Sequence, residues 1–186
     1  MDFTKLKRIN VIGTSGSGKS TLAKELSQLL NIPYVEMDSL FWKANWTEST
    51  DEEFIPKIEQ NLSSEKWVLD GNYQRTAKVK WKNVQTIIWV DYSKSRTFFQ
   101  AVKRAIVRIL NNKELWPGTN NRENFKQTFL SKKSILLWTY QTYDNNVKKY
   151  EAMLSDPAFK HIQIIRLRSP KEKKNLLKLI EQYKRQ

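Results

Sequence analysis

The chain has 186 residues and a net charge of +14; 39% of its residues are hydrophobic and 28% are charged, which predicts one folded domain rather than two domains or a disordered chain. Cysteine is absent, and its absence excludes disulfides and thiolate chemistry. No apolar run approaches the roughly 18 to 20 residues of a membrane span, and the basic start is followed by no long apolar segment or cleavage site, so we expect a cytoplasmic protein without signal peptide or membrane anchor.

Five short apolar runs alternate with helical patterns along the chain. They are apolar throughout rather than alternating, as expected for strands that are covered on both faces. Strands that alternate with helices predict right-handed crossovers and a three-layer α/β/α fold with a five-stranded parallel sheet. The expected strands span residues 8–12, 34–37, 66–70, 86–91 and 161–167.

The helices between these runs have recognisable ends. The first is expected to stop near residues 31–33, and the second follows Thr50, which forms a capping-box spacing with Glu53. A long basic helix is expected over residues 94–111, with Phe98, Val102, Ala105 and Ile109 on its core face. Another helix follows the loop 111–121, opens near Arg122 and runs to about residue 154. The last opens with Ser169-Pro170.

The stretch "INVIGTSGSGKSTLAKEL" joins the first strand to the first helix. Gly13, Gly18, Lys19 and Ser20 match the pattern G-x-x-x-x-G-K-[ST] in the strand–loop–helix context that a phosphate-binding loop requires. Its amides and the helix N-terminus would surround phosphate oxygens, Lys19 would reach the β- and γ-phosphates, and Ser20 would ligate Mg²⁺. The predicted ATP-binding residues are Gly13, Thr14, Ser15, Gly16, Ser17, Gly18, Lys19, Ser20 and Thr21.

A phosphate loop alone does not distinguish a kinase from a GTPase or a motor. The chain lacks N-K-x-D, and no D-x-x-G follows the third strand in a switch-like context. One small domain also leaves little room for motor or helicase machinery. A small kinase is the simplest function that this sequence predicts.

An aspartate follows the second predicted strand, and aromatic residues follow the aspartate. Asp38 precedes Phe41, Trp42 and Trp46 in a segment, residues 31–60, that carries seven acids and two bases. A carboxylate at this place can accept or orient the proton of an acceptor hydroxyl, and Trp42 can stack on a ring. The alternative is that Asp38 caps a short helix and that the tryptophans belong to the core.

The third predicted strand ends in Asp70, which is followed by Gly71. An acid at this position commonly orients Mg²⁺ in phosphate-loop proteins or meets the acceptor, and Gly71 would let the backbone pass close to a ligand. The alternative for Asp70 is an ordinary turn residue at a strand end. Because open α/β sheets bind ligands beyond the carboxyl ends of their strands, we expect Asp38 and Asp70 to face the γ-phosphate together.

The motifs "GTSGSGKST", "MDSLFWKANW", "WVLDGNY" and the arginines of "AVKRAIVRIL" together resemble the adenylate-kinase-like P-loop kinases over nearly the whole chain. The most similar group is the bacterial DNA topology modulation (FlaR-related) proteins. "LDGNYQRT" is similar to the L-D-G-F-P-R-T of adenylate kinases, with one extra residue before Arg75. The chain lacks the arginine that adenylate kinases place after the second strand to hold the AMP phosphate.

The resemblance also implies roles for arginines of a helical lid over residues 94–150. Arg104 and Arg108 are four residues apart, on one helix face, and correspond to an arginine pair that stacks on adenine and contacts the transferring phosphates. The resemblance extends to Arg75 and Arg122 as acceptor-binding residues and to Lys133. The short, cysteine-free loop 111–121 resembles a short lid without zinc.

We therefore predict a single kinase-like domain over residues 1–186, with an acceptor-binding segment at about 38–62 and ATP and Mg²⁺ as cofactors. Transfer of the γ-phosphate to a hydroxyl of a metabolite or nucleoside is the leading hypothesis, with Lys19, Asp38 and Arg108 as catalytic residues. A phosphate acceptor, as in a nucleotide kinase, is the alternative. Residues 94–150 carry twelve bases and three acids, so a nucleotide-dependent DNA-binding protein is a third hypothesis. Either a monomer or a homodimer is compatible with this sequence.

Overall fold

The computed structural model describes residues 1–131 and 134–185. All five predicted strands are present in one parallel sheet in the order β2-β5-β1-β6-β7, which confirms the predicted fold class. Their bounds are β1 Arg8–Gly13, β2 Tyr34–Glu36, β5 Trp67–Asp70, β6 Thr86–Val90 and β7 Gln163–Leu167. The parallel register pairs Val11 and Glu36 with Asp70, and Gly13 with Val90, so these strand ends lie along one edge of the sheet.

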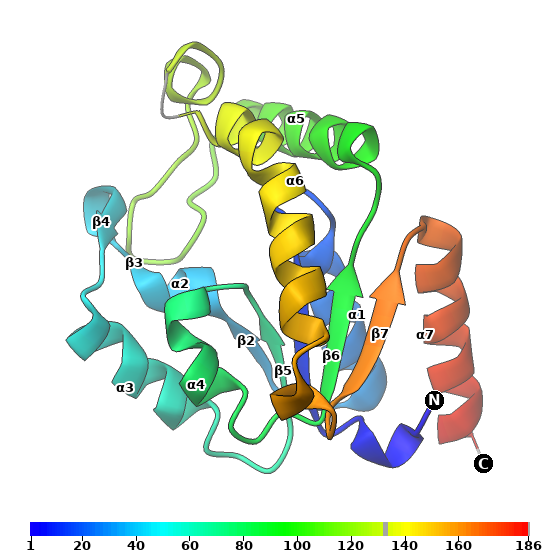
Figure 1. Cartoon of the computed structure of the whole chain (residues 1–186). Helices are drawn as coiled ribbons and strands as arrows, with labels where there is room; N and C mark the ends of the chain where they lie inside the picture. The colour runs from blue at the N-terminus through cyan, green and yellow to red at the C-terminus, as the bar shows by residue number, and fades with distance from the viewer. Residues whose placement is uncertain (132–133, 186) are drawn as a thin grey trace.

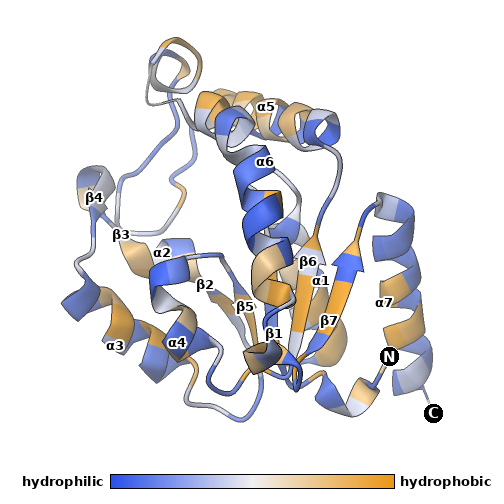
Figure 2. Ribbon diagram, in the orientation of Figure 1, coloured by the Kyte–Doolittle hydropathy of each residue, from blue (hydrophilic) through white to orange (hydrophobic). Residues whose placement is uncertain are grey.

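Helices cover both faces of this sheet (Figure 1). Helices α1 (Lys19–Leu30) and α7 (Pro170–Lys184) lie on one face, where Leu22, Leu26 and Ile180 pack on β1 and β6. Helices α3 (Asp51–Asn61), α4 (Ala77–Lys80) and α6 (Ile135–Leu154) lie on the other, where Phe54 and Trp81 are buried. In Figure 2 the strands are largely hydrophobic while the helices show both colours, as expected of a sheet that is covered on both sides.

The predicted helix caps are confirmed. The capping box of Thr50 and Glu53 opens α3, and Ser169, with Pro170 in the first turn, opens α7. Helix α1 ends at Asn31, whose φ of 54° places it in the left-handed region that asparagine tolerates at helix ends. These ends depend on contacts within a few residues, which is why the sequence predicts them.

Several short elements lie outside the predicted set. Helix α2 (Met37–Phe41) follows β2 directly, and an antiparallel hairpin joins β3 (Trp42–Lys43) to β4 (Thr47–Glu48) through the 3-10 turn η2 (Ala44–Trp46). The remaining short turns are η1 (Phe3–Lys5), η3 (Gln74–Thr76) and η5 (Pro157–Phe159). Within the described residues, no helix combines the length and the apolarity that crossing a membrane requires.

Two predictions about the lid helices are wrong. The second lid helix does not open near Arg122: a π-helical turn, η4 (Lys126–Leu130), comes first, and α6 begins at Ile135. In helix α5 (Lys94–Asn111) the buried residues are Thr97, Ala101 and Ala105 rather than the face with Phe98, Val102 and Ile109. Small residues face inward because α5 packs against the backbone of the phosphate loop, which leaves no room for larger side chains. Lys133 lies outside the described residues.

Candidate active site

The phosphate loop lies between the end of β1 and the start of α1, as the sequence predicts. Gly16 and Gly18 have φ angles of 82° and 94°, in the left-handed region that favours glycine. A Cβ at Gly16 would lie 2.7 Å from Ala101 Cβ and 2.8 Å from Thr97 O. Helix α5 therefore covers the loop at a distance that only glycine allows, and a larger residue at Gly16 would push the lid away.

The nine predicted loop residues differ in exposure. Gly13, Thr14, Gly16 and Ser17 are buried, Ser15, Gly18, Lys19 and Ser20 are partly exposed, and Thr21 is exposed on α1. The partly exposed Lys19 and Ser20 open α1, where the unpaired amides of a helix N-terminus attract anions. The loop thus retains the parts that the prediction assigned to a triphosphate and its magnesium.

The side chain of Asn72 forms two hydrogen bonds with the backbone of Gly13, the first residue of this loop. The sequence analysis did not predict this contact. Its side-chain amide donates to Gly13 O at 2.6 Å and accepts from Gly13 N at 3.2 Å. Asn72 follows the Asp70-Gly71 pair directly, so this amide links the end of β5 to the end of β1. In the sequence, this contact is indicated only by an amide side chain just beyond a strand end. Such a residue does not reveal which backbone group it bonds to, here one 59 residues away.

The two predicted carboxylates each accept a hydrogen bond from a tyrosine. Tyr34 Oη donates to Asp70 Oδ2 at 3.0 Å, and Tyr73 Oη donates to Asp38 Oδ1 at 2.8 Å. Burial raises the pKa of both phenols, and the neighbouring carboxylates raise it further, so both tyrosines stay protonated donors at neutral pH. Neither tyrosine was predicted as a site residue.

Asp70 is the acid that fits a metal-bound water. It is buried at 4% exposure, and its Oδ1 atom is enclosed without a hydrogen-bond partner among the described residues. A buried carboxylate oxygen without a partner is costly, and a magnesium ion or one of its water ligands would satisfy it. The residues present therefore fit the predicted roles of Asp70 and Ser20 toward Mg²⁺.

Arg104 connects the lid to the phosphate loop and the carboxylates. Its Nη2 atom donates to Ser15 Oγ at 3.2 Å. Burial lowers the pKa of this guanidinium and Arg108 lowers it further, whereas nearby acids raise it; these acids are Glu123, Asp38 and Asp70. The structure thus brings Arg104 of α5 into contact with the phosphate loop.

Arg108 forms an ion pair with Glu123, a residue that the sequence analysis did not single out. Arg108 Nη1 lies 2.7 Å from Glu123 Oε1, while Glu123 Oε2 is buried without a partner among the described residues. The pair joins α5 to the segment that follows the lid loop, residues 111–121. Arg108 therefore faces this following segment, one helical turn beyond Arg104.

Two other predicted arginines lie elsewhere. Arg75 pairs with Asp51 at 3.1 Å and lies over the ring of Phe41, 4.8 Å from its centroid. Arg122 Nη1 donates to Asn112 O at 2.6 Å and so binds the end of α5. Each would have to leave these contacts to bind an acceptor, and Arg122 lies in the irregular segment before η4.

Trp42 belongs to a row of three tryptophans from two segments. The rings of Trp42 and Trp46 are 5.6 Å apart at 77°, and those of Trp46 and Trp116 are 5.9 Å apart at 81°. Trp116 is in the lid loop and donates from Nε1 to Glu36 Oε1 at 3.2 Å. This bond attaches the tryptophan row to the end of β2, two residues before Asp38.

The lid loop is attached to the hairpin by one buried asparagine. Asn121 is fully buried; its Oδ1 accepts from Trp46 N at 2.8 Å and its Nδ2 donates to Lys43 O at 2.9 Å. The oxygen and the nitrogen of this amide therefore both bond to backbone groups of the hairpin, 75 and 78 residues earlier in the chain. This contact closes the lid loop over the acceptor segment.

Gly71 is also buried, and a Cβ built on it would lie 2.7 Å from Met37 Cβ. The chain after Asp70 therefore passes directly beneath α2, which carries Asp38. This close packing against Met37 gives a structural reason for glycine after β5; the predicted approach of Gly71 to a ligand stays a prediction.

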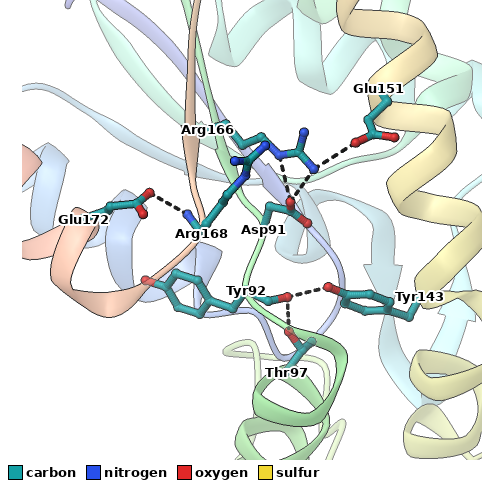
Figure 3. Close-up of polar contacts among 8 residues, drawn as sticks. All are labelled: Asp91, Tyr92, Thr97, Tyr143, Glu151, Arg166, Arg168 and Glu172. Carbon is teal, nitrogen blue, oxygen red and sulfur yellow. Dashed lines mark hydrogen bonds and ion pairs between the residues drawn. The ribbon is translucent and has the colours of Figure 1, made fainter.

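A second polar network fixes α6 to the sheet (Figure 3). Arg166 Nη2 bridges Asp91 at 2.7 Å and Glu151 at 2.9 Å, and the guanidinium lies 4.1 Å from the Trp89 ring centroid. Tyr143 donates to Tyr92 O, the carbonyl to which Thr97 of α5 also donates. Both lid helices are therefore anchored at the ends of β6 and β7.

We expect Arg166→Met to lower the free energy of unfolding by about 1–3 kcal/mol, because it leaves the largely buried Asp91 carboxylate without its cation. Urea unfolding at neutral pH measures the loss. Arg168→Met is the matched control, since the contact of Arg168 in this network is made by its backbone N–H to Glu172. Equal stability of the two variants would contradict the anchoring role.

The parallel sheet, the glycine loop between strand and helix, and the acids beyond β2 and β5 define a P-loop protein of α/β class. Residues 9–116 match the family model AAA_18, described as an AAA domain. That match covers more than half of the 186 residues, and the chain belongs to this family of P-loop proteins.

The chain is similar to several individual proteins, and the first comparison below agrees with the fold. A shikimate kinase from Bacteroides thetaiotaomicron superposes with a TM-score of 0.52 at 14% identity, covering 97% of this chain and 99% of that one. A gluconokinase from Sinorhizobium meliloti 1021 gives a TM-score of 0.49 at 16% identity, with 97% and 96% coverage. The uncharacterized protein YqaC of Bacillus subtilis (strain 168) is 34% identical over 70 residues, 35% of this chain and 38% of that protein.

Proposed function

We propose that the protein is a kinase that transfers the γ-phosphate of Mg-ATP to a hydroxyl group of a small molecule. The observation that carries the proposal is that the phosphate loop follows β1, beside the strand ends that carry Asp70 and precede Asp38, and that Arg104 of α5 bonds to Ser15 of this loop. Phosphoryl transfer needs positioning and charge stabilisation more than covalent chemistry, and these groups supply both.

In this proposal the acceptor hydroxyl oxygen attacks the γ-phosphorus while the bond to the β,γ-bridging oxygen breaks, and ADP leaves. Asp38 orients the hydroxyl and takes its proton, with Tyr73 fixing the carboxylate. Lys19 and the loop amides hold the phosphates, and Arg104 stabilises the charge on the group in transfer. Arg108 joins it only by exchanging its ion pair with Glu123 for the nucleotide. Ser20 and Asp70 would hold magnesium, which would neutralise part of the charge on the phosphates.

A phosphate acceptor is less well supported than a hydroxyl. Adenylate-kinase-like phosphate binding needs a free arginine near Asp38, and Arg75 is engaged by Asp51 and by the Phe41 ring. Arg122 is engaged at the end of α5. Leaving the half-exposed Asp51 pair costs Arg75 about 0–1 kcal/mol, so these contacts disfavour a phosphate acceptor only slightly.

The first test is direct. Titration calorimetry with a non-hydrolysable ATP analogue and Mg²⁺ should detect one binding site, and incubation with Mg-ATP and a panel of hydroxylated metabolites should release ADP with one of them. A chain that binds no purine nucleotide, or one that binds it but phosphorylates no member of a broad panel, would contradict the proposal.

Asp38→Asn is expected to lower kcat about 10²- to 10⁴-fold, because the amide cannot take the hydroxyl proton. The nucleotide affinity should change little, since the amide still accepts from Tyr73. Asp144→Asn, at an exposed carboxylate that pairs with Lys94, is the control and should retain full activity. An Asp38→Asn enzyme with unchanged kcat would remove Asp38 from the mechanism.

A further inference from the structure

We propose that the acceptor is a hydroxylated compound that carries a protonated amine, held by the tryptophan row and the carboxylates beside it. This inference rests on the proposed kinase function and names the class of its acceptor. The tryptophan row comprises Trp42, Trp46 and Trp116, and the acid cluster comprises Glu36, Asp38 and Asp70.

The tryptophan row has the arrangement of an ammonium-binding wall. Its neighbouring rings meet edge to face, at 77° and 81°, so their faces point in different directions rather than forming a flat stack. Trp42 and Trp46 are only partly buried and retain accessible ring surface. Tryptophan is the aromatic side chain that attracts cations most strongly, and ammonium ligands are held by several rings at once.

The acid cluster supplies negative charge next to this wall. Tyr34 donates to Asp70, and Glu36 is paired with Asp70 across β2 and β5. Asp38 follows Glu36 by two residues, so the three carboxylates lie at one edge of the sheet. Glu36 accepts from the indole of Trp116, which places a carboxylate at the edge of the tryptophan row. An ammonium group here would meet both ring faces and carboxylate oxygens.

Three cations on the acceptor side are paired with acids. Lys43 lies 2.7 Å from Glu53, and Arg75 lies 3.1 Å from Asp51. Arg108 pairs with Glu123, which leaves Arg104 for the phosphates of the nucleotide. A carboxylate or phosphate on the acceptor would therefore be repelled by three acids. Lys24, whose Nζ lies 5.3 Å from the Tyr34 ring centroid, reduces this repulsion but does not cancel it, because one cation cannot neutralise three carboxylates.

The hairpin that carries two of these tryptophans is held in a strained form. Asn45 and Trp46 have φ angles of 57° and 56°, and a bulky aromatic residue is rarely found in the left-handed region. Such strain persists where surrounding contacts fix it, and it is concentrated at ligand sites. Here Asn121 of the lid loop holds Trp46 N and Lys43 O, so the wall is built from two segments.

The experiment uses the full chain saturated with Mg²⁺ and a non-hydrolysable ATP analogue. Calorimetry compares matched triplets of hydroxylated compounds that share a scaffold and bear an amine, a neutral group or a phosphate: for example glucosamine, glucose and glucose 6-phosphate, with amino alcohols and aminocyclitols treated likewise. We expect one amine to bind at least about tenfold more tightly than its neutral and phosphorylated counterparts. Failure of every amine to bind below about 1 mM overturns the inference, as does tighter binding of a neutral or phosphorylated member.

Variants test the two halves of the site separately. Trp46→Leu should weaken binding of that amine about tenfold, whereas Trp46→Phe, which keeps an aromatic face, should weaken it less. Glu36→Gln should weaken the amine but leave the neutral counterpart unchanged. Circular dichroism and the affinity for the ATP analogue check that each variant is folded. Equal losses for amine and neutral ligands in Glu36→Gln would overturn the inference.

The two proposals fail in different ways. Absence of any heat from the ATP analogue would refute the kinase function itself. Normal nucleotide binding with phosphorylation of a neutral or acidic acceptor would leave the kinase function intact and refute only the ammonium site.

Discussion

Replacing Lys19 with alanine is expected to lower kcat/KM for phosphoryl transfer by at least about a hundredfold, since it removes a charge that stabilises the transferring group. Lys19 opens α1 and is partly exposed at the mouth of the phosphate loop, so its ammonium group can reach the phosphates without displacing a structural partner. The loss should include weaker binding of the ATP analogue, measured by calorimetry alongside the rate of ADP release.

The control is Lys178→Ala. Lys178 is an exposed lysine on α7, outside the phosphate loop. It lowers the net charge by the same amount and should change neither the rate nor the nucleotide affinity. If Lys19→Ala were as active as Lys178→Ala, the glycine loop would not be a nucleotide site and the proposed function would be wrong.

Lys80→Met is expected to stabilise the protein, by about 3–5 kcal/mol at pH 6. Lys80 ends α4 and is 1% exposed, and its Nζ has no hydrogen-bond partner among the described residues. Burial lowers its pKa from 10.5 to about 7, because a charged ammonium group is disfavoured in an apolar interior. Methionine fills a similar volume without this cost.

The pH dependence gives the sign of the effect. The folded pKa of Lys80 lies below the unfolded value, so between about pH 7 and 10.5 the unfolded chain binds more protons and the free energy of unfolding rises with pH. Below about pH 7 both states hold the proton and the full penalty applies. The stabilisation by Lys80→Met should therefore fall to about 2 kcal/mol at pH 9.

Urea unfolding of both proteins at pH 6 and pH 9 measures this difference. Lys78→Met is the matched control: Lys78 is on the same short helix but exposed, and its replacement should change stability little at either pH. A gain from Lys80→Met that did not exceed that from Lys78→Met, or that was equal at both pH values, would show that Lys80 is not charged in the core.

The sequence predicts those parts of the fold and the site that depend on neighbours in the chain. The phosphate loop and the caps at Thr50 and Ser169 are encoded within a few residues. The placement of Asp38 and Asp70 at one sheet edge follows from the strand pattern, because parallel strands end together. Each of these features has the predicted position.

What the sequence does not reveal depends on partners far along the chain. Tyr73 is 35 residues from Asp38, and Asn121 is 75 residues from Trp46, so no local pattern links them. Helix periodicity defines the faces of α5 but not which one is buried; the small residues Thr97, Ala101 and Ala105 face inward because the loop backbone at Gly16 lies against them. Acceptor chemistry depends on such long-range contacts.

The two tyrosine–aspartate bonds have a consequence for the cost of each reaction cycle. Tyr73 holds one oxygen of Asp38, and Tyr34 holds one oxygen of Asp70, so neither carboxylate turns freely about its last torsion. The ordering of both groups is completed when the chain folds, and an arriving ligand need not immobilise them again. Replacing either tyrosine with phenylalanine would free the carboxylate that it holds. Ligand binding would then have to immobilise that carboxylate, and the lost rotational entropy would weaken binding.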